Sequence, residues 1–427
     1  MIDIKLLREK PELIRENIKK RFQEGKLHLV DEARKKDIDW RNQKQRIDKL
    51  RNERNVISRE ISKAKKEGRD VSRLMKGAKL IPSKIEEIEK KTNKLQEQLN
   101  AILAQIPNIL HKSVPIGRDG SQNVEIKKIG VPKRFSFPLK NHVELAESLD
   151  IVDFETSAKT SGNGFYYLKG DLALLNQALI NFSREFMLSK GYEYIEPPLM
   201  IHENILTGVY STEEINAMAY KLNDEDLYLI ATSEHPLIGM FINKVLRKEV
   251  LPKKLTSYSM CFRKEIGSHG INEKGLFRTH QFNKQEMVVI CRPEDSYKFY
   301  DELLNLSVEI YKKLKIPTRI LESCSGDLAD LKAKGADLEY WSPLEQAYKE
   351  VGSVTNMEEA QARRLNIKFT DEKNERRFVH TLNNTVIATS RALVAILENN
   401  QNKDGSVTIP TVLQEYMGGK KVIKKQD

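Results

Sequence analysis

Two stretches near the beginning of the chain place apolar residues at alternating steps of three and four. The first spans residues 38–64, and the positions on its apolar face are Ile47, Leu50, Ile57, Ile61 and Ala64. The second begins at residue 81, and the positions on its face are Ile85, Ile88, Thr92, Leu95, Leu99, Ile102 and Ile106. Two such heptad runs, separated by a polar segment, predict two helices that pair as an antiparallel coiled-coil hairpin.

The turn of this hairpin is expected between residues 65 and 77, because Gly68 and Gly77 interrupt the pattern there. Helices of roughly 28 residues would form an arm about 40 Å long. An arm of that length cannot bury itself in a globular domain, so it is expected to project. Residues 1–110 are therefore predicted to form a first, helical domain.

The pattern changes after residue 107. Residues 111–138 are rich in Pro and Gly and are predicted to form a linker that leads into the next domain. In residues 139–427, helix and strand periodicities mix. A helix is predicted over Leu172–Gly191, where Leu175, Leu179 and Phe182 share a face, and a short strand follows at Tyr192–Ile195. The sequence thus predicts an α+β protein with an N-terminal helical arm.

A strand, a loop and a second strand are predicted over Cys261–Glu286. This hairpin gathers two arginines, an aromatic residue and two carboxylates. Arginine grips phosphate or carboxylate in a two-pronged contact, and a Phe ring offers a face for a base. A nucleotide with its phosphates is the simplest ligand for the set, although any single residue could belong to an ordinary surface hairpin.

Two other predicted strands end in an acid close to a hydroxyl. Along Tyr228–Glu234, alternation puts Thr232 and Glu234 on one side of the pleat. Along Tyr348–Ser353, Glu350 and Ser353 are oxygen ligands suited to Mg²⁺. An amphipathic helix is predicted over Ala392–Glu398, and Arg391 at its start adds a cation to a helix end that already favours anions.

Charge is concentrated on the predicted arm. The chain of 427 residues has 72 Lys or Arg against 61 Asp or Glu, a formal net charge of +11. Residues 41–80 hold fourteen Lys or Arg and five acids. This excess favours contact with a phosphate backbone, and the scarcity of aromatics favours a folded nucleic acid recognised by shape. An ordinary solvated coiled coil is the alternative.

Cysteine usage and the N-terminus bear on location. Cys261, Cys291 and Cys324 lie far apart and match no paired zinc-ligand spacing, so they are expected to be reduced thiols, and no structural zinc is expected. Neither a signal peptide nor an apolar run of membrane-spanning length is visible. The protein is therefore expected to be cytoplasmic, without a membrane partner.

Three stretches resemble the three motifs of class II aminoacyl-tRNA synthetases: Leu172–Pro197, Cys261–Glu286 and Asn383–Glu398. In closer detail the chain resembles the seryl-tRNA synthetase family over essentially its whole length. The segments that carry the likeness are TSE at 232–234, FRKE at 262–265, GLFRTHQFNKQE at 275–286, CSGDLAD at 324–330, ADLE at 336–339, QARR at 361–364, HTLN at 380–383, RALVAILENNQ at 391–401 and MGG at 417–419.

The resemblance implies a catalytic domain over residues 139–427, with a mostly antiparallel sheet flanked by helices. It also implies activation of L-serine by ATP with Mg²⁺, transfer of serine to tRNA(Ser), and a homodimer built by the first motif. The reaction needs no protein nucleophile, since the serine carboxylate attacks the α-phosphorus and the protein positions it and offsets charge.

Residue roles follow from the same resemblance. The implied catalytic residues are Arg263, Glu265 and Arg391. The implied ATP-binding residues are Arg263, Glu265, Arg278, Thr279, Phe282, Glu350, Val351, Gly352, Ser353 and Arg391, of which Glu350 and Ser353 would hold Mg²⁺. The implied serine-binding residues are Thr232, Glu234, Arg263, Glu286, Asn383 and Thr385. The implied tRNA-binding residues are Arg51, Arg54, Lys65, Lys66, Arg69 and Arg73, and the loop Gly267–Gly275 is expected to contact the tRNA acceptor end.

Two departures from the family pattern concern the ATP tail. The third motif contains NNTVIATSR at residues 383–391, without the glycines of many members, and Gly352 stands where Ser is frequent. These variants are similar to those of archaeal members.

Two alternatives stay open at this point. One is a non-catalytic RNA-binding or regulatory protein on the same scaffold, against which the full set of arginines and carboxylates argues. The other is an enzyme that charges a carrier protein, a reaction with no need of a basic arm.

Overall fold

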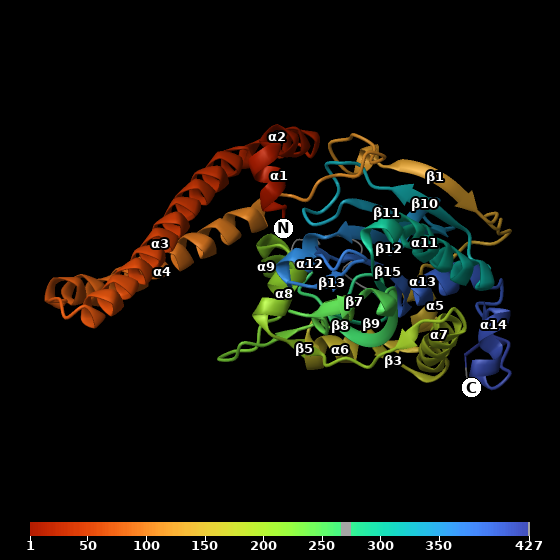
Figure 1. Ribbon diagram of the computed structural model, residues 1–427. Helices are drawn as coiled ribbons and strands as arrows, with labels where there is room; N and C mark the ends of the chain where they lie inside the picture. The colour runs from red at the N-terminus through yellow and green to blue at the C-terminus, as the bar shows by residue number, and fades with distance from the viewer. Residues whose placement is uncertain (266–274, 426–427) are drawn as a thin grey trace. The chain divides into compact units, whose positions relative to one another are not determined.

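The computed structural model describes residues 1–265 and 275–425. It divides into two compact units, Met1–Ile109 and Leu110–Asp427 (Figure 1). Within the described part of the chain, no helix combines the length and the apolar character that crossing a bilayer requires.

The first unit is helical. It contains α1 (Ile4–Glu9), α2 (Pro11–Lys20), α3 (His28–Lys66) and α4 (Ser72–Gln105). The long helices α3 and α4 run side by side (Figure 1), so the predicted hairpin is confirmed. Both are longer than expected, with 39 and 34 residues, and α3 extends for about 58 Å.

The turn between α3 and α4 is shorter than the sequence indicated. Gly68 lies in it with a φ of +70°, a conformation that glycine adopts without strain. Gly77, however, lies inside α4, so the expectation that it breaks the pattern is wrong. A glycine inside a helix costs only about 1 kcal/mol relative to Ala, which a long packed hairpin tolerates.

The helical unit has a broad core only at the base of the hairpin. There α1, α2, α3 and α4 bury one apolar cluster, whose members include Leu7, Ile14, Val30 and Leu99. Farther along, the buried cluster shrinks to Ile47, Ile81, Ile85 and Ile88. The distal hairpin is therefore held by a single seam, and its other faces are left to charged side chains.

The second unit is built on an eight-stranded sheet with the order β1-β10-β11-β12-β15-β9-β8-β4. All neighbours are antiparallel except β4 and β8. The strands are β1 (Val124–Ile129), β4 (Glu193–Tyr194), β8 (Lys253–Phe262), β9 (Gln281–Cys291), β10 (Thr318–Glu322), β11 (Lys334–Ser342), β12 (Ala347–Glu358) and β15 (His380–Ala388). The predicted α+β class with a mostly antiparallel sheet is confirmed. The segment 111–138, predicted as a linker, supplies the edge strand β1.

The two faces of the sheet have different environments, which β9 illustrates because its side chains alternate. Met287, Val289 and Cys291 join the large core cluster on one face. That face is covered by α7 (Gly170–Ser189), α11 (Ser296–Lys313) and α13 (Thr389–Asn400). Val288 and Ile290 point to the opposite face, into a smaller cluster.

The remaining helices lie around these layers. They are α5 (His142–Ser148), α6 (Phe154–Ser161), α8 (Glu203–Val209), α9 (Thr212–Met218), α10 (Glu234–Gly239), α12 (Ala360–Arg364) and α14 (Thr411–Gln414). Of these, α8 contacts both α10 and α12, and α10 contacts β9. The smaller cluster thus covers one end of the second sheet face.

Several local expectations can be compared with the structure. The hairpin over Cys261–Glu286 is formed by β8 and β9, and the helix over Leu172–Gly191 by α7, so both are confirmed. The strand over Tyr228–Glu234 is wrong in extent, because β6 contains only Tyr228–Leu229 and Glu234 begins α10. The amphipathic character of Ala392–Glu398 is also wrong: every residue of α13 except Arg391 is buried, because the helix packs between the sheet and other helices.

Candidate active site

Two cavities lie on the second sheet face, where Phe282, Lys284 and Glu286 of β9 contribute to their lining. We call the first the arginine cavity, because Arg263, Arg278 and Arg391 line it. We call the second the glutamate cavity, because Glu214, Glu234, Glu286 and Glu350 line it. The two share Arg263, Lys284, Glu350 and Thr385, so they form one continuous site.

Every residue that the sequence nominated for ATP, Mg²⁺ or serine lines one of these cavities. Those in the arginine cavity are Arg263, Glu265, Arg278, Thr279, Phe282, Glu350, Val351, Gly352, Thr385 and Arg391. Those in the glutamate cavity are Thr232, Glu234, Arg263, Glu286, Glu350, Ser353, Asn383 and Thr385. The fold therefore brings together residues from distant parts of the chain, and their individual roles stay predictions.

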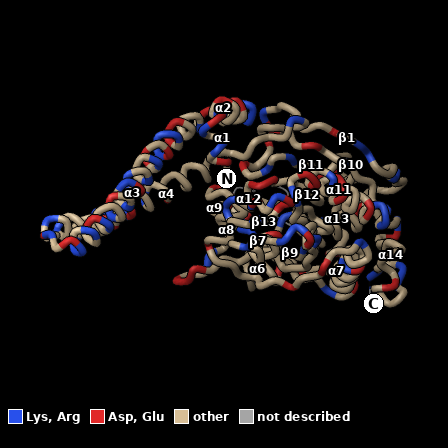
Figure 2. Tube along the Cα trace, in the orientation of Figure 1, with Lys and Arg blue, Asp and Glu red and all other residues tan. Residues whose placement is uncertain are grey.

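The residues nominated for nucleic-acid contact belong to the helical unit. Arg51, Arg54, Lys65, Lys66, Arg69 and Arg73 are all exposed there. Figure 2 shows Lys and Arg along α3 and around its turn into α4, with acidic residues between them. Of the predicted loop Gly267–Gly275, residues 267–274 lie outside the described residues.

In the arginine cavity, cations lie beside aromatic rings. The guanidinium of Arg263 lies 5.2 Å from the centre of the Phe282 ring, and that of Arg391 lies 5.0 Å from the centre of the Phe277 ring. Arg278 faces Glu265, with Nε 3.4 Å from Oε2. Fixed guanidinium groups attract phosphate and carboxylate oxygens, and ring faces accept a planar base.

A β-bulge in β12 determines which side chains reach the cavities. Leu338 pairs with Gly352 and Glu339 pairs with Glu350, so Val351 has no partner in the ladder. In a regular strand, residues three positions apart such as Glu350 and Ser353 would point to opposite faces, because side chains alternate. With the bulge, both line the glutamate cavity.

Arg391 holds the carboxylate of Glu350. Its Nη1 lies 3.0 Å from Oε2 of Glu350 and donates to the Glu350 carbonyl at 3.2 Å. Burial would raise the pKa of Glu350, but the surrounding cations, Arg391 foremost, together lower that pKa. Asp337, opposite Ser353 in the ladder, behaves in the opposite way: burial and then the charge of Glu350 raise its pKa to about 6.

In the glutamate cavity, Glu286 is held from both sides. Lys284 Nζ lies 2.6 Å from Oε2 of Glu286, and Asn383 Nδ2 donates to Oε1 at 3.2 Å. The Glu286 side chain is fully buried. A buried carboxylate with two fixed partners has one orientation, so it can serve as a rigid acceptor for an ammonium or hydroxyl group.

Glu234 occupies a different environment from Glu286. Gln361 Nε2 donates to Oε1 of Glu234 at 2.9 Å, and Gln361 itself accepts from the Thr381 hydroxyl at 2.6 Å. Burial, followed by the charge of Glu286, raises the pKa of Glu234 to about 7. Glu234 is thus able to exchange a proton near neutral pH.

The sequence reasoning missed several side chains of the site. Lys284 is the clearest, since it lies between Phe282 and Glu286 on the same face of β9, and strand alternation alone would have identified it. Asp337 and Gln361 lie in stretches that carried the family likeness but received no role. Tyr210 lines the glutamate cavity and packs edge-on against buried His235, with the two ring centres 4.4 Å apart. No pattern in the sequence indicated it.

Metal ligation by the protein alone is limited. In residues 1–265 and 275–425, no three His, Cys, Asp or Glu side chains are grouped closely enough to hold a metal ion. The three cysteines are buried and free. A cation here would therefore need further oxygen ligands from a bound molecule.

Two family models match the chain. Residues 1–110 match the seryl-tRNA synthetase N-terminal domain, and residues 210–400 match the tRNA synthetase class II core domain (G, H, P, S and T). The serine–tRNA ligase of Methanospirillum hungatei is 46% identical over 425 residues, which cover 99% of this chain and 100% of that protein.

Solved structures agree with this likeness. The crystal structure of seryl-tRNA synthetase from Pyrococcus horikoshii complexed with ATP has a TM-score of 0.94 and 41% identity, with complete coverage of both chains. The cytoplasmic serine–tRNA ligase from Naegleria fowleri in complex with AMP has a TM-score of 0.88 and 33% identity, over 100% of this chain and 99% of that one.

Proposed function

The chain belongs to the seryl-tRNA synthetase family, and from this premise we propose which residues bind ATP, serine, Mg²⁺ and tRNA. The activity is that of an ATP-dependent serine–tRNA ligase, a class II aminoacyl-tRNA ligase. It joins serine to AMP and then transfers serine to the 3′ end of tRNA(Ser). A non-catalytic role on the same scaffold is not supported, and the likeness to archaeal members holds.

One observation carries the residue assignment: a cation-lined cavity and a carboxylate-lined cavity meet at Arg263. In this proposal the arginine cavity takes ATP, and the glutamate cavity takes serine. Arg263 then contacts both the serine carboxylate and the α-phosphate that it attacks. A shared guanidinium aligns nucleophile and electrophile and offsets the charge that develops between them.

The ATP base and phosphates are assigned to separate parts of the arginine cavity. Phe282 offers its ring to adenine, and Glu265 accepts from the adenine amino group. Arg278 and Arg391 hold the outer phosphates, with Thr279, Val351 and Gly352 forming the wall. The ion pairs that Arg278 and Arg391 make with Glu265 and Glu350 support this, because they keep both guanidinium groups at the cavity.

Serine recognition is assigned to the glutamate cavity. Glu286 accepts from the serine ammonium or hydroxyl group, Thr232 and Thr385 add hydroxyl partners, and Glu234 and Asn383 shape the pocket. A site that hydrogen-bonds a substrate hydroxyl can reject an analogue without it by roughly 10⁴- to 10⁵-fold. Threonine has the hydroxyl and must be excluded by space.

A divalent cation fits the donors at β12. Glu350 and Ser353 offer hard oxygen atoms in one cavity, and Asp337 lies opposite Ser353. Two or three protein oxygens with the rest from phosphate are what Mg²⁺ prefers in nucleotide sites. When bound, Mg²⁺ would offset phosphate charge, while Arg263 and Arg391 orient the reacting groups.

The helical unit is proposed to bind tRNA through Arg51, Arg54, Lys65, Lys66, Arg69 and Arg73. Their exposure and the scarcity of aromatics along this part of the hairpin support contact with phosphates. The protein is further proposed to be a cytoplasmic homodimer. Leu174 and Leu188 on α7 support the dimer, being 54% and 47% exposed.

Serine-dependent exchange of pyrophosphate into ATP tests the proposal, since it needs the two cavities and no tRNA. We expect exchange with serine, and much weaker exchange with threonine or alanine. Exchange that is absent with serine, or stronger with another amino acid, would refute the division of the site. Sedimentation of the purified chain tests the dimer.

A further inference from the structure

The residues that form one wall of the arginine cavity follow directly on a buried anchor. Phe277, Arg278 and Thr279 line the cavity, and Leu276, just before them, is fully buried in the large core cluster. The backbone N–H of Leu276 donates to Nε2 of His142 at 3.3 Å. His142 lies far away in sequence, at the first position of α5, and belongs to neither cavity.

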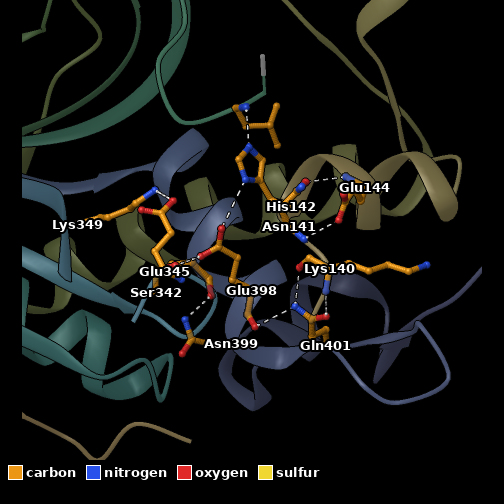
Figure 3. Close-up of polar contacts among 12 residues, drawn as sticks. Lys140, Asn141, His142, Glu144, Ser342, Glu345, Lys349, Glu398, Asn399 and Gln401 are labelled. Atoms are coloured by element: carbon orange, nitrogen blue, oxygen red, sulfur yellow. Dashed lines mark hydrogen bonds and ion pairs between the residues drawn. The ribbon is translucent and has the colours of Figure 1, made fainter. Parts of the chain in front are cut away.

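The other ring nitrogen of His142 faces a buried acid. Nδ1 lies 3.5 Å from Oε1 of Glu398 near the end of α13, and only 2% of the Glu398 side chain is exposed (Figure 3). The second oxygen of Glu398 accepts from the hydroxyls of Ser342 at 2.7 Å and Tyr340 at 3.1 Å. Glu398 is thus fixed by β11 and offers its first oxygen to His142.

These partners assign the tautomer of His142. Because Nε2 accepts from a backbone N–H, it carries no proton, and Nδ1 must carry the proton that faces Glu398. A histidine with a donor on one side and an acceptor on the other cannot rotate its ring without losing both contacts. Glu398 therefore sets the orientation in which Nε2 meets Leu276.

The backbone of His142 is fixed as well. Asn141 caps α5 in a capping box with Glu144. The side chain of Gln401 accepts from the N–H of Lys140 and donates to its carbonyl, both at 3.0 Å (Figure 3). The start of α5 is thereby tied to the residue directly after α13.

The approach of the Leu276 segment to His142 leaves no room for a side chain at the preceding position. Gly275 has a φ of +128°, and a Cβ there would clash with Nε2 of His142. This glycine is required both for its backbone conformation and for the close contact. The position of Leu276 against His142 is therefore specified from both sides.

The three residues after Leu276 are the ones assigned to the nucleotide. Two cations approach the Phe277 ring, with Lys349 Nζ 5.1 Å and the Arg391 guanidinium 5.0 Å from its centre. Arg278 pairs with Glu265 across the cavity. A shift of Leu276 would move Phe277, Arg278 and Thr279 together.

We propose that His142, oriented by Glu398, is a positioning residue for ATP: it holds the N–H of Leu276 and so fixes the wall formed by Phe277, Arg278 and Thr279. The proposal rests on the assignment of ATP to the arginine cavity. His142 contacts no reacting atom and acts through the backbone alone. It is therefore expected to affect ATP affinity more than serine affinity.

Two substitutions test the contacts of the two ring nitrogens separately. In His142→Gln, the side-chain amide reaches as far as Nε2 and can still accept from Leu276. In His142→Asn, the amide stands near Nδ1 and can only donate to Glu398. Loss of one hydrogen bond to a buried N–H corresponds to about a five- to tenfold effect. We expect His142→Asn to raise KM for ATP by that factor in pyrophosphate exchange, with KM for serine changed less than twofold and His142→Gln close to wild type.

The matched control is His202→Gln, since His202 is exposed and its Nδ1 contacts Asp226, at 2.8 Å from the carbonyl and 3.3 Å from the carboxylate, away from both cavities. Hydrogen exchange of the peptide containing Leu276 gives a readout independent of catalysis, and its amide should exchange faster in His142→Asn than in His142→Gln. The proposal would be overturned if the two variants had equal KM for ATP. It would also be overturned if KM for ATP and KM for serine rose by the same factor. Wild-type protein without serine-dependent exchange would instead refute the proposed function.

Discussion

The basic residues of α3 and the charged residues of the two cavities are similar in type and differ in burial. Arg51 and Arg69 in the helical unit have side chains 49% and 62% exposed, and their ion pairs with Glu89 and Glu67 lie in water. Lys284 and Glu286 in the glutamate cavity are 8% and 0% exposed. Exposed ion pairs contribute about 0–1 kcal/mol, whereas breaking a buried one costs about 3–5 kcal/mol.

The difference concerns how each region recognises its ligand. Exposed cations along a helix act as a group on a polyanion, so their number matters more than the position of any one. Buried charges act through fixed geometry, so a change of shape at constant charge is already damaging. The helical unit is thus expected to tolerate single substitutions that the cavities do not.

Removing the distal hairpin should have the largest effect on tRNA charging. We expect replacement of residues 46–91 by a short glycine linker to lower kcat/KM for tRNA on the order of 10³-fold, because most phosphate contacts are lost. The base cluster, which includes Leu29 and Leu99, stays intact. Pyrophosphate exchange should change less than twofold, and a parallel loss of exchange would show that the hairpin supports the folding of the catalytic unit.

The substitution Arg263→Lys should come next, since it keeps the charge and removes the planar fork. Arg263 lies at both cavities, and its Nε donates to the Ala231 carbonyl at 3.3 Å. We expect a loss of exchange kcat of about 100-fold. The matched control is Arg247→Lys on β7 (Val245–Arg247), where Arg247 is exposed. A loss of exchange kcat below threefold would show that a positive charge at this position suffices for catalysis without the planar guanidinium.

A third test compares stability with pH at Glu234. Its pKa is raised from 4.5 to about 7 in the folded state, so between these values the folded protein binds more protons than the unfolded one. The free energy of unfolding should therefore fall as pH rises from about 4.5 to about 7, on the order of 2–3 kcal/mol. In Glu234→Gln this fall should disappear, as measured by urea unfolding at several pH values. Glu213→Gln, at an exposed position of α9, should keep the wild-type slope.

Single substitutions on the hairpin should have the smallest effects. We expect Lys66→Gln to lower tRNA affinity only about two- to fivefold and to reduce the slope of log affinity against log salt by about one. Binding measured at several salt concentrations distinguishes this from a local structural effect. A loss near that of the whole hairpin would show that Lys66 makes one specific contact, contrary to the comparison.

The predictable part of the fold is the part set by residues close in sequence. The heptad runs predicted α3 and α4, and the strand, loop and strand of Cys261–Glu286 predicted β8 and β9. Alternation along β9 also contained Lys284, which was overlooked. The predictions that failed depend on distant neighbours: Glu234 begins a helix instead of ending a strand, and α13 is buried on all sides.

For the candidate site, too, the residue types could be predicted from the sequence, whereas their environments could not. Residue types and spacing nominated its arginines and carboxylates, and the family likeness gave them roles that assays must still test. Burial and the charge of Glu286 then raised the pKa of Glu234 to about 7, which the sequence could not indicate. A pKa depends on the partners and solvent around a group, and these come from other strands and helices.

The sequence by itself determined the coiled-coil hairpin, the excess of positive charge upon it, and the residue types available for a nucleotide and an amino acid. Periodicity and charge are properties of neighbouring residues and need no tertiary contact. Only the tertiary structure decided that a bulge at Val351 directs the side chains of Glu350 and Ser353 into the same cavity. It also decided that His142 contacts Leu276 and Glu398. Bulges and buried hydrogen bonds are set by the register of segments that are distant along the chain, which no local pattern contains.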